Sequence, residues 1–176
     1  GGDDVITTAS VTATGDDSTI TSALTTVTDI NVSGAGALTL VVSAGGDFNA
    51  VDTVSAAGHS GGLTLDLDAN DLDVSITTGS GDDAITLSDN GDEGRTVDLG
   101  AGDDTLSLDD ADGDLVIANA SGTVAGDSMD GGAGDDTLSV NGNTGADVFG
   151  QDVSDIFTNF ENLAITTDDD DTLDLD

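Results

Sequence analysis

The sequence predicts an all-β fold, a right-handed parallel β-solenoid, from three observations. Short segments in which aliphatic residues alternate with Thr, Ser or Asp recur along the 176 residues. Clusters of Gly, Asp, Asn and Ser separate these segments. One block, made of a strand, a glycine-aspartate corner and a second strand, occurs three times. Period-two alternation is typical of half-buried strands, and a repeated block indicates a stack of similar coils.

The alternating segments are the predicted strands, because each places aliphatic side chains on one face and polar side chains on the other. They lie at residues 38–40, 63–67, 72–76, 85–87, 97–99, 106–108, 138–140 and 173–175. No two of them are joined by an obvious hairpin turn. Helical periodicity is confined to 154–163, where Ser154 or Asp155 is the expected cap of a single helical turn.

The repeated block indicates how the coils are stacked. Asp83 lies 21 residues before Asp104, which lies 32 residues before Asp136. Unequal spacing of equivalent residues suits a solenoid in which one connection of each coil varies in length. The three copies of the block lie at residues 74–87, 97–108 and 129–140.

The charge of the chain limits its partners. The net charge is −36, from 37 acidic residues and one basic residue, Arg95. Nucleic-acid binding needs Lys and Arg, and anionic membrane surfaces repel acidic chains, so both partners are excluded. The only glutamates are Glu93 and Glu161. Because Asp forms turns and is a short oxygen ligand, its near-exclusive use favours cation-binding turns over a salt-adapted surface or a disordered acidic chain.

The glycine-aspartate corners match one nonapeptide pattern, G-G-x-G-x-D-x-U-x, in which U is a large aliphatic residue. Residues 131–139 fit it at every position, and residues 142–150 differ by an Asn at the second position. Residues 78–86 and 99–107 lack only the first glycine. Over roughly 74–150 the chain resembles the RTX family, whose repeats form a parallel β-roll with calcium bound in the turns. Residues 156–165 also look like segments of RTX-type surface-layer and adhesin proteins.

The resemblance implies which residues bind calcium. Glycine permits the positive φ that turns backbone carbonyls inward, and a carboxylate beside these carbonyls completes the oxygen shell that calcium prefers. In the fifth position the backbone carbonyl is the expected ligand, and in the sixth position the carboxylate. Ordinary turns without metal remain the alternative. The expected ligands are Asp83, Asp104, Asp136 and Asp147 at the sixth position, Asp82, Asp103 and Asp135 at the fifth, and Gly79, Gly81, Gly100, Gly102, Gly132 and Gly134 in the carbonyl cradle.

Stacking gives an independent reason to expect a cation. Neighbouring strands lie about 4.8 Å apart, so equivalent aspartates repel by about 3.5 kcal/mol per pair at an effective dielectric constant of about 20. We therefore expect several calcium ions and a folding reaction driven by calcium. The corresponding division of the chain is a degenerate solenoid part at 1–73, a calcium-binding β-roll at 74–150, and a terminal turn and strand segment at 151–176, continuous with the solenoid.

Few side chains are suited to catalysis. The chain has one His, one basic residue, and no Cys, Trp or Tyr. His59 is expected in an exposed loop, and Arg95 in a surface ion pair. Neither a nucleophilic triad nor a sugar-binding aromatic platform can be assembled from this set. We therefore expect no enzyme activity.

The expected function is that of a calcium-dependent extracellular structural protein. A bacterial surface-layer or related self-assembling component fits best, exported by type I secretion, located at the cell surface and without direct membrane insertion. The chain is expected to be a mature or excised piece, since no segment reads as a signal peptide or a membrane span. Two alternatives stay open: a repeat segment of a large RTX adhesin that binds surfaces or glycans, and the non-catalytic RTX domain of a secreted hydrolase or toxin.

Overall fold

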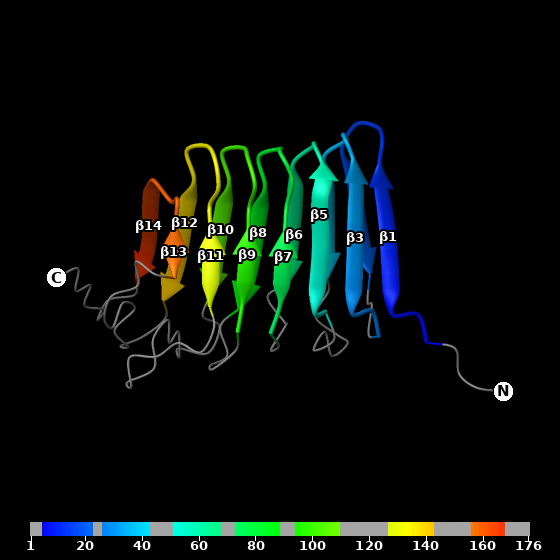
Figure 1. Cartoon of the computed structure of the whole chain (residues 1–176), viewed down its shortest axis with the longest axis horizontal. Helices are drawn as coiled ribbons and strands as arrows, with labels where there is room; N and C mark the ends of the chain where they lie inside the picture. Colours follow the sequence, from blue (N-terminus) through cyan, green and yellow to red (C-terminus); the bar gives the residue numbers. More distant parts are fainter. Residues whose placement is uncertain are drawn as a thin grey trace.

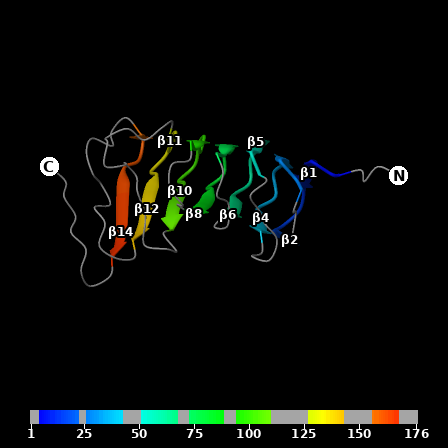
Figure 2. The ribbon, with the colours of Figure 1, turned by 90° about the horizontal axis from the view of Figure 1, so that it is seen from below.

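A computed structural model of the chain describes residues 5–22, 26–42, 51–67, 73–88, 94–109, 127–142 and 156–167. These residues form two parallel sheets of seven strands each, which face one another along the length of the molecule (Figures 1 and 2). The predicted all-β parallel solenoid is thereby confirmed. The described residues contain no helix with the length and apolar character needed to cross a membrane.

The first sheet contains the odd-numbered strands in chain order, each hydrogen-bonded to the next. Its longer strands lie at the amino-terminal end of the stack (Figure 1). The strands are β1 (Thr8–Ala13), β3 (Asp29–Gly34), β5 (Thr53–His59), β7 (Ser75–Thr77), β9 (Thr96–Asp98), β11 (Ser128–Asp130) and β13 (Phe157–Thr158).

The second sheet contains the even-numbered strands, again in chain order and in parallel. Each coil therefore gives one strand to each sheet, so residues 20 to 32 positions apart in the sequence become neighbours. The strands are β2 (Ser18–Ser22), β4 (Leu38–Val42), β6 (Leu63–Leu67), β8 (Ala84–Ser88), β10 (Thr105–Asp109), β12 (Thr137–Gly142) and β14 (Asn162–Thr167).

The core is built from columns of aliphatic side chains between the two sheets. Ile85, Leu106 and Leu138 occupy the eighth position of the nonapeptide and pair in register across β8, β10 and β12. All three are at most 4% exposed, as expected of the aliphatic face of a half-buried strand. Thr86, Ser107 and Ser139, at the next position of each strand, are partly exposed, as period-two alternation requires.

The tight corners lie together along one long edge of the molecule, the upper edge in Figure 1. They join each odd strand to the following even strand, and the strongest motif matches, 78–83, 99–104 and 131–136, connect β7 to β8, β9 to β10 and β11 to β12. Parallel stacking thus places the equivalent residues of these corners above one another.

The helical turn predicted at 154–163 is wrong for residues 156–163. Phe157–Thr158 forms β13 and pairs with β11, and Asn162 begins β14, which pairs with β12. A positive φ of 57° at Asn159 makes the bend between the two strands. Phe157 and Phe160 pack edge to face with ring centroids 6.3 Å apart, against the core. Pairing with the preceding coil outweighs the local helical pattern here.

Candidate metal centre

The sixth-position aspartates form a buried column inside the corner edge. Asp83, Asp104 and Asp136 each precede an even strand and follow one another in register, since β8, β10 and β12 pair in parallel. They are 2%, 1% and 0% exposed. Burying a carboxylate costs free energy unless the charge is hydrogen-bonded or paired. The column therefore needs compensating partners.

Backbone N–H groups of the neighbouring coil are the first such partners. The N–H of Leu63 donates to Oδ1 of Asp83 at 2.7 Å, and the N–H of Asp83 donates to Oδ1 of Asp104 at 2.7 Å. The N–H of Asp104 donates to Oδ1 of Asp136 at 2.8 Å. Glu161 ends the column, because its Oε2 accepts the N–H of Asp136 at 2.9 Å. Each carboxylate thus links its own coil to the one before it.

The second carboxylate oxygens differ along the column. Oδ2 of Asp83 accepts a long hydrogen bond, 3.4 Å, from the N–H of Gly79. By contrast, Oδ2 of Asp104 and Oδ2 of Asp136 are buried and have no hydrogen-bond partner among the described residues. A buried charged oxygen without a partner carries most of its desolvation cost. These two oxygens are therefore the ones available to a cation.

The glycines of the same two corners have the conformation that the motif predicts. Gly100 and Gly102 have φ of 82° and 142°, and Gly132 and Gly134 have φ of 92° and 154°. Gly79 and Gly81, the described glycines of the Asp83 corner, do not have a positive φ. The 99–104 and 131–136 corners therefore share both the turn geometry and the free carboxylate oxygen, whereas the 78–83 corner has neither.

These corners also stack too closely for any larger residue. A Cβ added at Gly132 would overlap the carbonyl oxygen of Gly100, and one added at Gly134 would overlap that of Gly102. A Cβ at Gly102 would lie 3.1 Å from Oδ1 of Asp104, which places the carboxylate directly against the corner glycine. Carbonyl oxygens of one coil thus lie against the glycines of the next, inside the same corner as the carboxylates.

We expect the substitution Gly132→Ala to destabilise the chain by about 1–3 kcal/mol through backbone strain alone, and by more through the overlap with Gly100. Gly58→Ala is the matched control, since a Cβ there meets nothing within 4 Å. Urea unfolding followed by far-ultraviolet circular dichroism measures both. Equal stability of the two variants would contradict the corner geometry.

The fifth-position aspartates form a second, exposed row on the outside of the corner edge. The N–H of Asp103 donates to Oδ1 of Asp82 at 3.0 Å, and the N–H of Asp135 donates to Oδ1 of Asp103 at 3.0 Å. Their side chains therefore cap the backbone of the adjacent coil in solvent. The last predicted ligand, Asp147, lies outside the described residues.

Burial changes the acidity of the column. It raises the pKa of Asp104 from 3.8 to about 7, and the neighbouring charges of Asp83 and Asp136 add to this, against the hydrogen bond from the N–H of Asp83. Burial likewise raises the pKa of Asp83 and of Asp136. A negative charge is thus unfavourable at these positions unless a cation is present.

The raised pKa predicts how the metal-free chain responds to pH. A folded-state pKa above the unfolded value means that stability is fully present below the unfolded pKa and is lost as pH rises through the folded pKa. For Asp104 this window runs from about pH 4 to about pH 7. In excess chelator we expect a higher melting temperature at pH 5 than at pH 8. A melting temperature that rises across this interval would contradict the buried, unpaired column.

Carboxylates alone do not complete a metal site. Among the described residues, no three or more His, Cys, Asp or Glu side chains converge as a set that could hold an ion. Calcium takes six to eight oxygen ligands and accepts backbone carbonyls and water as well as carboxylates. The free oxygens of Asp104 and Asp136, with the carbonyls of the glycine corners, are chemically suited to calcium, and the lack of nitrogen or sulfur donors does not favour softer metals.

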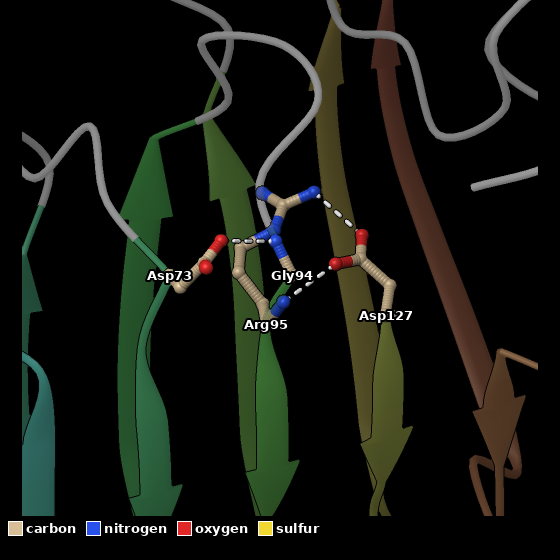
Figure 3. A network of polar contacts seen from close by, with 4 residues as sticks. All are labelled: Asp73, Gly94, Arg95 and Asp127. Atoms are coloured by element: carbon tan, nitrogen blue, oxygen red, sulfur yellow. Dashed lines mark hydrogen bonds and ion pairs between the residues drawn. The ribbon is translucent and has the colours of Figure 1, made fainter. Parts of the chain in front are cut away.

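Arg95 lies at the start of the first-sheet strand β9, away from the corner edge, and not in the expected surface ion pair. Its Nη2 and the carboxylate of Asp127 are 2.9 Å apart, with side chains 4% and 1% exposed. The backbone N–H of Arg95 also donates to Oδ1 of Asp127, at 2.7 Å, and Gly94 donates to Asp73 of the preceding coil at 2.6 Å (Figure 3). The only basic residue therefore neutralises a buried carboxylate.

His59 also differs from its prediction. It is the last residue of β5 and is 1% exposed, not part of an exposed loop. His59 pairs with Gly34 of the preceding coil, and its carbonyl oxygen lies against Gly79 of the next coil. Position in the stack, which the local Gly-His-Ser-Gly sequence does not reveal, determines its burial.

Glu161 was missed as the end of the carboxylate column. It stands immediately before β14 as Asp136 stands before β12, but it lacks the preceding glycine corner. The pairing of the two strands is the signal that identifies it.

No protein-family model, curated protein or solved structure matches the chain, so the likeness to RTX proteins depends on the motif residues alone.

Proposed function

We propose that this chain is a non-catalytic, calcium-dependent structural protein of the bacterial cell exterior, in which calcium stiffens a β-solenoid rod. The observation that carries the proposal is the pair of buried carboxylate oxygens without partners, on Asp104 and Asp136. An extracellular location is part of the proposal, because extracellular calcium modules bind at about 10⁻⁴–10⁻³ M, a concentration well above that of cytosolic calcium. A surface-layer or related component remains the best-fitting class.

Electrostatics supports a cation between the coils. Three carboxylates follow one another through a buried column, where neighbouring like charges repel by about 3.5 kcal/mol per pair. A divalent ion reverses the sign of this interaction and supplies the missing partner of each free oxygen. Asp104 and Asp136 would each hold one ion, and the carbonyls of the corner concerned would complete its oxygen shell.

The substitution Asp104→Asn tests the proposal with a matched control, Asp103→Asn. Both remove one charge from the same corner, but Asp104 is buried with a free oxygen and Asp103 is exposed. We expect Asp104→Asn to lose at least half of the rise in melting temperature that calcium produces, because one of two sites is removed. Asp103→Asn is expected to keep nearly all of it. An equal loss in both would show that calcium acts only on the general acidity of the chain.

The ends of the stack support self-assembly as part of the same proposal. Ile20 on β2 and Leu163 on β14 are the outermost described members of one interior column, and they are 39% and 48% exposed. A coil from a second copy would cover either of them and continue the parallel sheets. Sedimentation velocity in calcium is expected to show species larger than the 17.2 kDa chain. A monomer at every concentration would remove assembly while leaving the calcium role intact.

A further inference from the structure

We infer that calcium lengthens a pre-formed rod: the coils at 26–67 fold without calcium, and the coils at 94–142 are added to them when calcium binds. The inference depends on the proposed calcium role and says where in the chain that role ends. It divides a repetitive fold into a segment that is folded with or without calcium and a segment that folds only with calcium, joined by the coil at 73–88.

The first observation is a change of residue type within one column. Leu38 and Leu63 pair in register and are 1% and 0% exposed. One coil further along, Asp83 takes the same position, since Thr64 pairs with Ala84. Burying a Leu side chain is favourable by about 1.5–3 kcal/mol, whereas burying an unpaired carboxylate is unfavourable. The residue at this position thus stabilises the amino-terminal coils, where it is Leu, and destabilises the carboxy-terminal coils, where it is Asp.

The second observation concerns the hydrogen bond that opens each even strand. In the amino-terminal coils the acceptor is a neutral backbone carbonyl: Ser18 donates to the carbonyl oxygen of Ala37, and Leu38 to that of Gly62, both at 2.9 Å. In the carboxy-terminal coils a column carboxylate takes this role, as described for Asp104 and Asp136. The strands β2 and β4 therefore complete this bond without a buried charge. Leu63, which opens β6, is the first residue along the stack whose N–H donates to a column carboxylate, that of Asp83.

The third observation is the distribution of buried acids. Within the described residues, the buried acids are Asp83, Asp104, Asp127 and Asp136, and all of them follow residue 67. Of the 23 buried apolar residues among the described ones, 11 lie within 26–67, four in the joining coil at 73–88 and seven within 94–142. The amino-terminal segment therefore buries more apolar side chains and no acid, whereas the carboxy-terminal segment buries fewer apolar side chains together with three of the acids.

Asp83 marks the junction. Both of its oxygens accept backbone N–H groups, from Leu63 and from Gly79, so it lacks the free oxygen of the two later corners. Its coil can attach to the Leu63 coil with protein donors alone. The next coil, with Asp104, is the first in which a buried carboxylate oxygen has no partner among the described residues.

A stack of this kind permits partial folding, because each coil contacts only its neighbours and the stability of the array is close to a sum of local contributions. The β5 and β6 edges of the folded amino-terminal segment are then templates for the parallel addition of β7 and β8. Calcium would act at successive coils beyond that point.

Hydrogen exchange with mass spectrometry on the full chain tests the inference at pH 7.5, in millimolar calcium and in excess chelator. In calcium, the strands that the structure describes within 26–67 and within 94–142 should all be protected, and these strands are meant by the two ranges below. In chelator, 94–142 should exchange at least tenfold faster while 26–67 keeps its protection. Simultaneous loss in both segments would overturn the inference but leave the calcium role standing. Persistent protection of 94–142 in chelator would instead reject the calcium role itself.

A charge-matched pair of variants tests the apolar column directly. Leu63→Asp places a carboxylate in the column, whereas Thr64→Asp adds the same charge at the adjacent exposed position. In chelator, Leu63→Asp should remove the protection of 26–67 and Thr64→Asp should retain it. Equal protection in both variants would overturn the role of the leucine column. In calcium, Asp104→Asn should reduce the protection that calcium adds within 94–142, because one of the two sites is removed, and should leave the protection of 26–67 unchanged.

Discussion

Replacing Arg95 with Met should lower the free energy of unfolding by about 3–5 kcal/mol, the usual cost of removing one partner of a buried ion pair. The substitution leaves the carboxylate of Asp127, whose side chain is 1% exposed, without the guanidinium 2.9 Å away. In a chain with 37 acidic residues no other basic side chain can take its place. Urea unfolding in the presence of calcium measures the loss.

The double variant Arg95→Met/Asp127→Asn separates charge from packing. Asn at 127 keeps an acceptor for the backbone N–H of Arg95 but no longer buries a charge. We expect it to recover most of the stability lost in the single variant. If the free energy of unfolding of Arg95→Met were within about 1 kcal/mol of the parent value, the ion pair would contribute no more than an exposed surface pair does.

Removing calcium should have an effect of similar size. With calcium at tenfold excess over its dissociation constant, each site contributes about 1.4 kcal/mol, so the two free-oxygen sites contribute about 3 kcal/mol. For a chain of this length that corresponds to a fall of about 6–12 °C in melting temperature. Thermal unfolding at pH 7.5 with and without chelator measures it, and magnesium at the same concentration is the control for general screening of charge.

A fall of this size is large because domains are stable by only about 5–15 kcal/mol. The fall in melting temperature should also depend on the buried aspartate column and not on the net charge of the chain. The exposed carboxylates of Asp82, Asp103 and Asp135 are already solvated by water. Equal protection by magnesium, or by sodium at matched ionic strength, would assign the effect to screening.

Period-two alternation and the repeated corner were sufficient to predict parallel sheets, inward aliphatic residues and positive φ at Gly100, Gly102, Gly132 and Gly134, all of which depend on local sequence. The same corner motif predicts positive φ at Gly79 and Gly81, where the structure has none. By contrast, the burial of His59 and of Arg95 depends on which coil lies above and below, at separations that vary from 20 to 32 residues. Local sequence does not encode that register.

The same limit applies within the candidate site. The motif makes Asp83, Asp104 and Asp136 equivalent, yet only the last two have a free oxygen, because Asp83 meets Leu63 and Gly79. Likewise, the helical pattern at 154–163 is overridden by pairing of β13 and β14 with the preceding coil. Neighbouring coils, not the repeat itself, determine which corners are suited to calcium.

Counting bound calcium ions by native mass spectrometry tests the central claim most directly. The parent chain should retain ions that the double variant Asp104→Asn/Asp136→Asn does not, while Asp103→Asn/Asp135→Asn should retain the parent number. If the buried double variant held as many ions as the parent, the column would not be a calcium site, and the account given for this fold would be wrong.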